Sequence, residues 1–399
     1  MRRVLIALVV LAVLSAAGYV YINRESQATQ VASSTQNKKP AFKKDDPTHI
    51  EEAASNGNMI PARMLITKSE EMANSTELEI VPTMESASKA KNQVWAGAFQ
   101  LVWNDFMNEL VKGPIKFLKK QPAMVDLLNK QKFTTNDVQE SAYYKKWGEA
   151  SPKLKKEIED GIWEKFNEKS QILDSFDFTP QPFKYFLYVM MKKDLEYEEE
   201  FEILQPGKFE GSETLVKYFG IEKEPYGYGR NVKGTVGVLF YNNDKDFAVT
   251  LHSKQGDLIH LYKVNTNKTL AEIYAEMKQK TKNTYDRMQS IDKFKAPKID
   301  FNKTQEFNEL YNKPIKSYTP PIMEWEIVKA MERIEFKMDE KGAKMVAEAG
   351  IMALGKSAAG PNQRQPRYFY FTGPYAIFIE EPGKTPYFAA YIKDPSSIQ

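Results

Sequence analysis

The chain has 399 residues, no cysteine, and a formal net charge of +3 from 56 basic and 53 acidic side chains. This near balance gives no reason to expect nucleic acid or an anionic membrane surface as the main partner. The absence of cysteine excludes a disulfide framework, a thiolate nucleophile and a cysteine-ligated zinc. A hydrophobic fraction of 42% and an aromatic fraction of 12% are typical of a globular protein with a sizeable core.

The first 22 residues predict export from the cytoplasm. Arg2 and Arg3 precede an uncharged apolar run, residues 4–22, which contains the small residues Ser15, Ala16 and Ala17. This pattern is typical of a signal peptide, and the run is also just long enough to span a bilayer as an uncleaved anchor. With the arginines inside, either alternative places the remainder outside the cytoplasm, and membrane contact is expected only through an uncleaved segment 4–22.

A polar segment separates this N-terminal run from the folded part of the chain. Residues 23–56 are rich in Ser, Gln, Asn, Lys and Asp and contain few large apolar side chains. Such a composition cannot bury enough surface to offset the entropy of ordering, so we expect a disordered tether. Residues 57–399 are expected to form a single folded domain, which we predict to be a monomer.

Two helices are predicted in the first part of this domain. The stretch 92–113 repeats large apolar side chains at helical spacing, and Gly113 is expected to end it. The second helix begins at Ser151 and Pro152, a capping residue followed by a proline in the first turn. The apolar faces comprise Phe99, Val102, Phe106 and Leu110 in the first helix, with Trp95 and Trp103 in its core, and Leu154, Ile158, Ile162 and Phe166 in the second.

Most of the later chain is predicted to be strand. Aromatic and β-branched side chains or strict alternation mark these segments, which are separated by glycine and proline. One helix interrupts them, because Thr269 to Glu272 is a capping box that precedes the apolar residues Ile273 and Met277. Helices first and strands later predict an α+β fold with large, mostly antiparallel sheets. The predicted strands are 182–192, which we expect to be buried, three segments within 234–264, the segment 334–338, and three segments within 367–392.

The motifs of common enzymes are missing from the chain. Of the three histidines, His49 lies near the tether, while His252 and His260 fall on neighbouring predicted strands and are expected to be ordinary strand residues. No HExxH or similar spacing occurs, so we predict no metal site, and no Gly-x-Ser-x-Gly elbow supports a hydrolase. A Ser-His-Asp arrangement stays open, since its members meet only in space. We therefore predict no catalytic residue and no cofactor, and we interpret the acidic run 196–200 as a solvated face.

The stretch GIMALGKS, from Gly350 to Ser357, has the spacing of a phosphate-binding loop. That loop requires a buried strand before it and a helix after it, whose N-terminus faces the phosphates. The preceding residues carry too many charges for a central parallel strand, and Gly360, Pro361 and Pro366 exclude a helix of useful length afterwards. The context therefore argues against a nucleotide-binding protein.

Two C-terminal stretches match a known family pattern. A predicted strand runs into Glu340, Lys341, Gly342 and Ala343, an acid followed by a glycine and an alanine-bearing segment. The C-terminal part therefore resembles the serpins, the serine protease inhibitor fold, and these residues are similar to the serpin hinge. The end of the chain is similar to the last two serpin strands through Phe371, Pro374 and Tyr375, and then Pro386, Phe388, Asp394 and Pro395.

The resemblance implies a reactive loop between the hinge and the last strands. By the family's spacing from Glu340, the bait residue falls on Lys356 and the cleaved bond on Lys356–Ser357. A lysine there implies a trypsin-like serine protease as the partner, since such a protease binds a cation in an acidic pocket. The implied mechanism is a trap: the protease cleaves the loop, and the freed hinge inserts as a strand into a sheet. The hinge residues so implied are Glu340, Gly342, Ala343, Met345, Ala347 and Ala349.

Strand insertion requires alternate side chains to enter a core. The residues 343, 345, 347, 349, 351 and 353 are all apolar, whereas Lys344 and Glu348 fall on the other face. Three departures from the serpin pattern stand against strand insertion. Met345 and Val346 are larger than the residues usual there in inhibitory serpins, the segment between Lys356 and Phe371 is longer than usual, and Ala390 stands where the family has a glycine. Two alternatives remain open. The same stretch is rich in helix formers, and the fold could serve as a non-inhibitory binding or structural module outside the cytoplasm.

Overall fold

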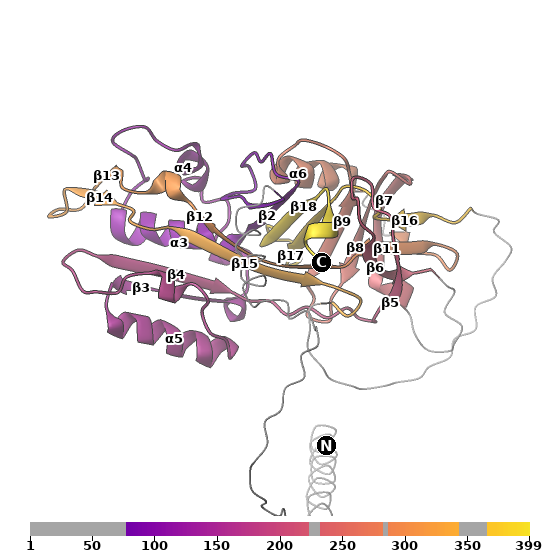
Figure 1. Ribbon diagram of the computed structural model, residues 1–399, viewed down its shortest axis with the longest axis horizontal. Helices are drawn as coiled ribbons and strands as arrows, with labels where there is room; N and C mark the ends of the chain where they lie inside the picture. The colour runs from indigo at the N-terminus through magenta and orange to yellow at the C-terminus, as the bar shows by residue number, and fades with distance from the viewer. Residues whose placement is uncertain (1–76, 223–231, 282–285, 343–364) are drawn as a thin grey trace, which may run out of the picture. The chain divides into compact units, whose positions relative to one another are not determined.

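Eight strands form the largest sheet in the computed structural model of the chain (Figure 1). Their order is β1-β2-β18-β17-β9-β8-β7-β10, and every neighbouring pair is antiparallel except β1 with β2. The structure describes residues 77–222, 232–281, 286–342 and 365–399, which belong to the compact unit Pro61–Gln399. The strands are β1 (Leu78–Ile80), β2 (Asn92–Ala96), β7 (Val236–Asn243), β8 (Asp246–His252), β9 (Leu258–Lys263), β10 (Asp286–Arg287), β17 (Tyr375–Glu380) and β18 (Phe388–Ile392).

Within these described ranges, four smaller sheets accompany the large one. The four-stranded sheet has the order β16-β11-β6-β5, and the others are the pairs β12-β15, β13-β14 and β3-β4. Together with the helices these sheets confirm the predicted α+β class. Their strands are β3 (Tyr143–Glu149), β4 (Tyr185–Met191), β5 (Glu202–Gly207), β6 (Val216–Ile221), β11 (Lys293–Pro297), β12 (Ile299–Glu306), β13 (Pro314–Lys316), β14 (Glu324–Glu326), β15 (Met331–Met338) and β16 (Tyr368–Tyr370).

The strands predicted between 234 and 264 and between 367 and 392 are confirmed as β7, β8, β9, β16, β17 and β18. Every residue of β17 and β18 is buried, because both strands lie in the middle of the eight-stranded sheet. The predicted alternation in β15 is also confirmed, with Ile334 and Met338 buried and Phe336 half-buried. The predicted boundaries of the N-terminal run and the tether lie outside the described residues.

The predicted helix over 92–113 is wrong at its start, whereas its end next to Gly113 is confirmed. Residues 92–96 form β2, whose backbone pairs with β18 in register from Asn92 to Ala96, so tertiary pairing overrides local helix preference. The helix α3 runs over Gly97–Asp105 and continues as a π-helix over Phe106–Val111. It ends at Lys112, which adopts a left-handed φ of 59°, one residue before Gly113. Trp95 and Trp103 are both buried as expected, although Trp95 lies in a strand.

The helix α5 (Pro152–Phe166) confirms the second helix prediction. The Ser151 hydroxyl accepts a hydrogen bond from the Leu154 backbone N–H, which caps the helix. Its apolar face packs on β3 and β4 in a second, smaller core that is separate from the main one. The predicted strand 182–192 is therefore β4, but it lies in a two-stranded sheet under α5 and only part of it is buried. The residues of this smaller core are Ala150, Leu154, Ile158, Ile162, Leu173, Phe178, Phe186 and Tyr188.

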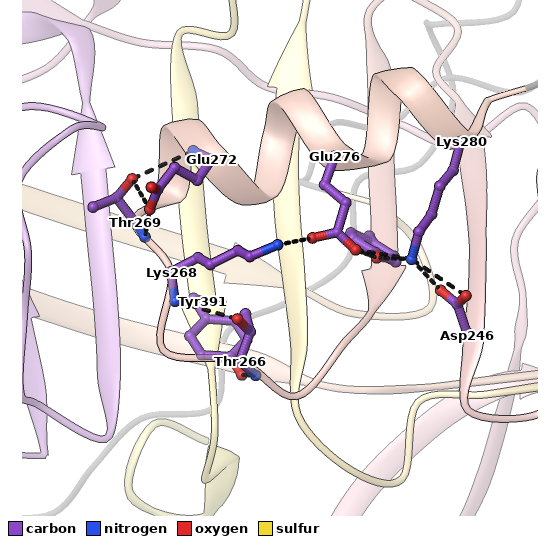
Figure 2. A network of polar contacts seen from close by, with 9 residues as sticks. Asp246, Thr266, Lys268, Thr269, Glu272, Glu276, Lys280 and Tyr391 are labelled. Carbon is purple, nitrogen blue, oxygen red and sulfur yellow. Dashed lines mark hydrogen bonds and ion pairs between the residues drawn. The ribbon is translucent and has the colours of Figure 1, made fainter.

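The helix α6 (Leu270–Lys280) is held on the large sheet by a network of polar contacts (Figure 2). Thr269 and Glu272 form the predicted capping box, in which each side chain bonds the other residue's backbone N–H. At the other end Lys280 bridges Glu276 of the same helix and Asp246 of β8, at 2.8 and 3.0 Å. The helix α4 (Ala123–Leu128) is short and packs against α3. No helix among the described residues is long and apolar enough to cross a membrane.

The helix α3 begins with a close approach between backbone and ring. A Cβ on Gly97 would lie 2.1 Å from Phe133 Cε1, so the buried Phe133 ring occupies the space of a side chain. The same helix packs against both β4 and β15, which belong to different sheets (Figure 1). The seating of α3 therefore determines where those two strands lie.

We expect Gly97→Ala to lower the free energy of unfolding by about 1–3 kcal/mol, because the added methyl overpacks a core position. Urea denaturation would measure this change. Gly148→Ala on β3 is the matched control, since its Cβ would lie 3.4 Å from the nearest atom of Leu154, an ordinary contact. Equal stability of the two variants would contradict the packing described for α3.

Candidate functional site

The hinge predicted from sequence lies at the end of β15. After Met338 the chain makes a turn in which the Lys341 backbone N–H donates to Asp339 Oδ1 at 2.9 Å. Gly342 forms isolated antiparallel bridges with Asp339 and with Glu196. The chain has therefore reversed direction by Gly342 and runs beside the segment that follows β4.

Glycine is required at this turn for two reasons. Gly342 has a φ of 103°, which side chains rarely adopt, and its Cβ would lie 2.4 Å from the Leu195 carbonyl oxygen. Two backbone hydrogen bonds also join the turn to the segment after β4. The Tyr197 N–H donates to Lys341 O at 3.2 Å, and the Phe201 N–H donates to Glu340 O at 2.9 Å. The backbone at the predicted hinge is thus held in one place and one conformation.

Glu340 is buried at the hinge and carries its own counter-ion. Its carboxylate accepts a hydrogen bond from Lys298 Nζ, 42 residues earlier in the chain. Burial of the carboxyl is the largest single effect and opposes ionisation. The hydrogen bond and charge of Lys298, a backbone hydrogen bond and the charge of Lys341 together outweigh it, so the pKa of Glu340 is lowered from its ordinary value of 4.5. The ion pair fastens the end of β15 to the start of β12, the strand beside it.

The described residues resume at 365, and Arg367 lies in a second group of charged residues. The Arg367 guanidinium donates to the buried carboxylate of Asp292 at 2.7 and 3.1 Å, and also bonds Asp286 and the Arg287 carbonyl. The Arg367 backbone N–H donates to the other oxygen of Asp292 at 3.0 Å. From here β16 pairs parallel with β11 at the edge of the four-stranded sheet. Sequence reasoning missed both clusters, since their partners are distant in the chain and no motif marks them.

Two strands near the hinge have open edges. Within the described ranges, β4 pairs with β3 alone and β15 pairs with β12 alone. Both strands pack on α3. Burial raises the pKa of Tyr188 on β4, a hydrogen bond with Ser170 is the largest effect that offsets this rise, and the charge of Arg333 on β15 offsets it to a smaller extent. We call the space between these edges the slot between β4 and β15.

An open strand edge presents backbone N–H and C=O groups that another extended segment can bond. The slot borders the segment 195–197, where Gly342 already runs antiparallel to the chain. A segment that continues from Gly342 in that direction would enter the slot as a strand. The remaining predicted site residues, Ala343, Met345, Ala347, Ala349, Lys356 and Ser357, lie outside the described residues.

The two histidines on predicted strands and the acidic run 196–200 also lie within the described residues. His252 and His260 lie on β8 and β9 as expected, and His260 Nε2 lies 3.3 Å from the buried Glu380 carboxylate, which also bonds Tyr274 and Lys278. Among the residues that the structure describes, no group of three or more possible metal ligands comes together. The acidic run 196–200 is only partly solvated: Glu196 pairs with Lys254, and Tyr197 is buried.

Comparison with known proteins gives structural neighbours only. Neither a protein-family model nor a curated protein matches the sequence. The fold is similar to Serpin48 of the insect Tenebrio molitor, with 13% identity, a TM-score of 0.36, and coverage of 60% of this chain and 64% of that chain. It is also similar to human kallistatin, with 14% identity, a TM-score of 0.37 and coverage of 60% and 63%. Thyroxine-binding globulin in complex with thyroxine is a third neighbour, with 9% identity, a TM-score of 0.37 and coverage of 61% and 65%.

These three neighbours are serpins, the family that the C-terminal motifs resemble. The similarity concerns fold and, at these TM-scores, says nothing about activity. The matched region also spans less than two thirds of each neighbour's length.

We expect Glu340→Gln to lower the free energy of unfolding at pH 7 by about 1–3 kcal/mol, because it removes a charge-assisted bond to a largely buried lysine. The pKa of Glu340 is lowered in the folded state, so its contribution is present above the ordinary value of 4.5 and is lost as pH falls below it. Urea denaturation at pH 7 and pH 4 would show the difference between wild type and variant shrinking.

The control for this prediction is Glu335→Gln on the same strand. The Glu335 side chain is 65% exposed and pairs with Arg333 at the surface. An exposed pair contributes about 0–1 kcal/mol, so this variant should stay close to the wild type. A Glu340→Gln variant as stable as Glu335→Gln would show that the hinge does not depend on the ion pair.

Proposed function

We propose that the chain is a serpin-like inhibitor that acts outside the cytoplasm and traps a trypsin-like serine protease. The protease cleaves Lys356–Ser357, and the freed segment from Gly342 onward inserts into the slot between β4 and β15. The observation that supports this best is the reversal at Gly342, which aims the chain antiparallel along the segment after β4. The protein would thus act by binding and not by catalysis.

Three further features are consistent with insertion. The slot has open edges on both sides within the described residues, so a new strand could form hydrogen bonds to β4 and to β15. The core-facing positions of the predicted insert are all apolar. The far end of the loop is anchored separately by Arg367 and Asp292, so cleavage would free the hinge side while β16 stays in its sheet.

A second candidate is a non-inhibitory binding module. A small cavity of about 240 Å³ lies between α6, β2 and the segment after α4, with Trp95, Phe133 and Tyr274 in its lining. Ligand pockets usually measure about 300–1,000 Å³. This cavity is smaller than that range, so it gives no specific support to the binding of a small ligand.

Incubation with trypsin should give an SDS-stable complex for the wild type, because the acyl-enzyme is trapped before it is hydrolysed. We expect Lys356→Ala to abolish the complex, since the bait residue no longer fits the acidic pocket. The matched control is Lys341→Ala, which removes an exposed lysine from the hinge turn and should leave complex formation unchanged. Cleavage at Lys356–Ser357 without any complex would refute protease trapping.

Insertion can be tested without a protease complex. A nick between Gly350 and Gly360 should raise the melting temperature of the wild type, because the freed segment gains strand contacts in the slot. We expect Ala347→Asp to remove this gain, as it would bury an unpaired carboxylate. Lys344→Asp, on the water-facing side of the insert, should keep it. Equal gains for both variants would contradict the proposed strand register, and no gain in the wild type would contradict insertion itself.

A further inference from the structure

Glu332 is a buried carboxyl on β15, the strand that borders the slot. It is 4% exposed, and its side chain points at the first turn of α3. Its Oε1 accepts a hydrogen bond from the Phe99 backbone N–H at 3.3 Å, while its Oε2 is buried with no hydrogen-bond partner in the described part of the chain. The residue therefore joins β15 to α3 through one bond and leaves a second polar atom unsatisfied.

Among the described residues, no charged group on the elements around Glu332 forms an ion pair with it. On β12, Lys303 lies on the same buried face, one cross-strand pair away, since Gln305 is the residue opposite Glu332. On β15, Arg333 and Glu335 pair with each other at 2.7 Å, and at the far end of α3 Asp105 pairs with Lys145. The first turn of α3 has no acidic residue, and β4 has no charged residue.

Burial is the dominant effect on this carboxyl. It raises the pKa of Glu332 to about 8, and the hydrogen bond from Phe99 offsets only part of that rise. A carboxylate in this place lacks water, so ionisation disfavours the arrangement in which β15 is seated on α3. Lifting β15 away from α3 would let water reach the carboxylate and return the pKa of Glu332 to its ordinary value of 4.5.

We propose that Glu332 is a proton-operated brace for the slot. With the carboxyl protonated, β15 stays seated on α3; loss of that proton favours lifting of β15 and so access to the slot beside β4. The effect on loop insertion rests on the proposed function, whereas the seating of β15 on α3 does not. The brace would therefore control how readily the slot receives a strand.

Hydrogen exchange of the amides of β12 and β15 tests the brace directly. The opening equilibrium should rise by up to about 90-fold between pH 6 and pH 9, after correction for intrinsic exchange, if the carboxyl moves from a seated pKa of about 8 to an ordinary one of about 4.5. Glu332→Gln keeps the acceptor for Phe99 but cannot ionise, so its opening should be independent of pH. The control Glu335→Gln should follow the wild type.

A pH-dependence that persists in Glu332→Gln, or a wild type whose opening does not change with pH, would overturn the brace. Should Glu332→Gln not fold, Glu332→Met is the second variant, since it fills a similar volume without an ionisable group, and the same pH-independence is expected. The exchange result judges the brace whether or not trypsin is trapped. Complex formation that is faster at pH 9 in the wild type than in the non-ionisable variant, after correction for the protease's own pH profile, would link the brace to insertion.

Discussion

The main constraint around the predicted hinge is that β4 and β15 each have backbone groups along one edge that are not bonded to another described strand. Each strand has one partner in the described structure, and both rest on α3, which supplies side-chain contacts but no backbone ladder. An open strand edge stays unpaired when it is covered or kept apart from other strands, and it can pair with an extended segment that reaches it. Gly342, the last described residue before the predicted insert, forms a bridge with Glu196 in the segment that follows β4.

Buried ion pairs define the two ends of the segment 343–364. Glu340 with Lys298 holds the end of β15, and Arg367 with Asp292 holds the start of β16. A buried charge pair contributes little net stability, but removing one partner is destabilising because the other charge stays behind unpaired, so the pair fixes position more than it stabilises. The surface network of α6, in which Lys280 bridges Glu276 and Asp246, attaches a helix in a more exposed setting.

Glu332 differs from these pairs because it forms no ion pair with any residue that the structure describes. Glu340 has a lysine as its partner, whereas the one hydrogen bond to the Glu332 side chain within the described residues comes from a backbone N–H. The two carboxyls on and just after one strand therefore respond to pH in opposite ranges: one loses its contribution in acid, and the other resists ionisation up to about pH 8. The end of β15 is thus held by the ion pair of Glu340 with Lys298, whereas Glu332 near its start contacts α3 through a hydrogen bond from a backbone N–H.

The sequence alone determined the elements whose signals are local. Capping residues and apolar periodicity identified α5 and α6, and alternation identified β15. The glycine at the predicted hinge was singled out through the family resemblance. Tertiary structure decided the rest: β2 became a strand because β18 pairs with it, β15 paired with β12 and not with β4, and Lys298 and Asp292 met partners 42 and 75 residues away. Local patterns reveal the period of a segment, whereas its partner is chosen by packing between parts of the chain that no short window contains.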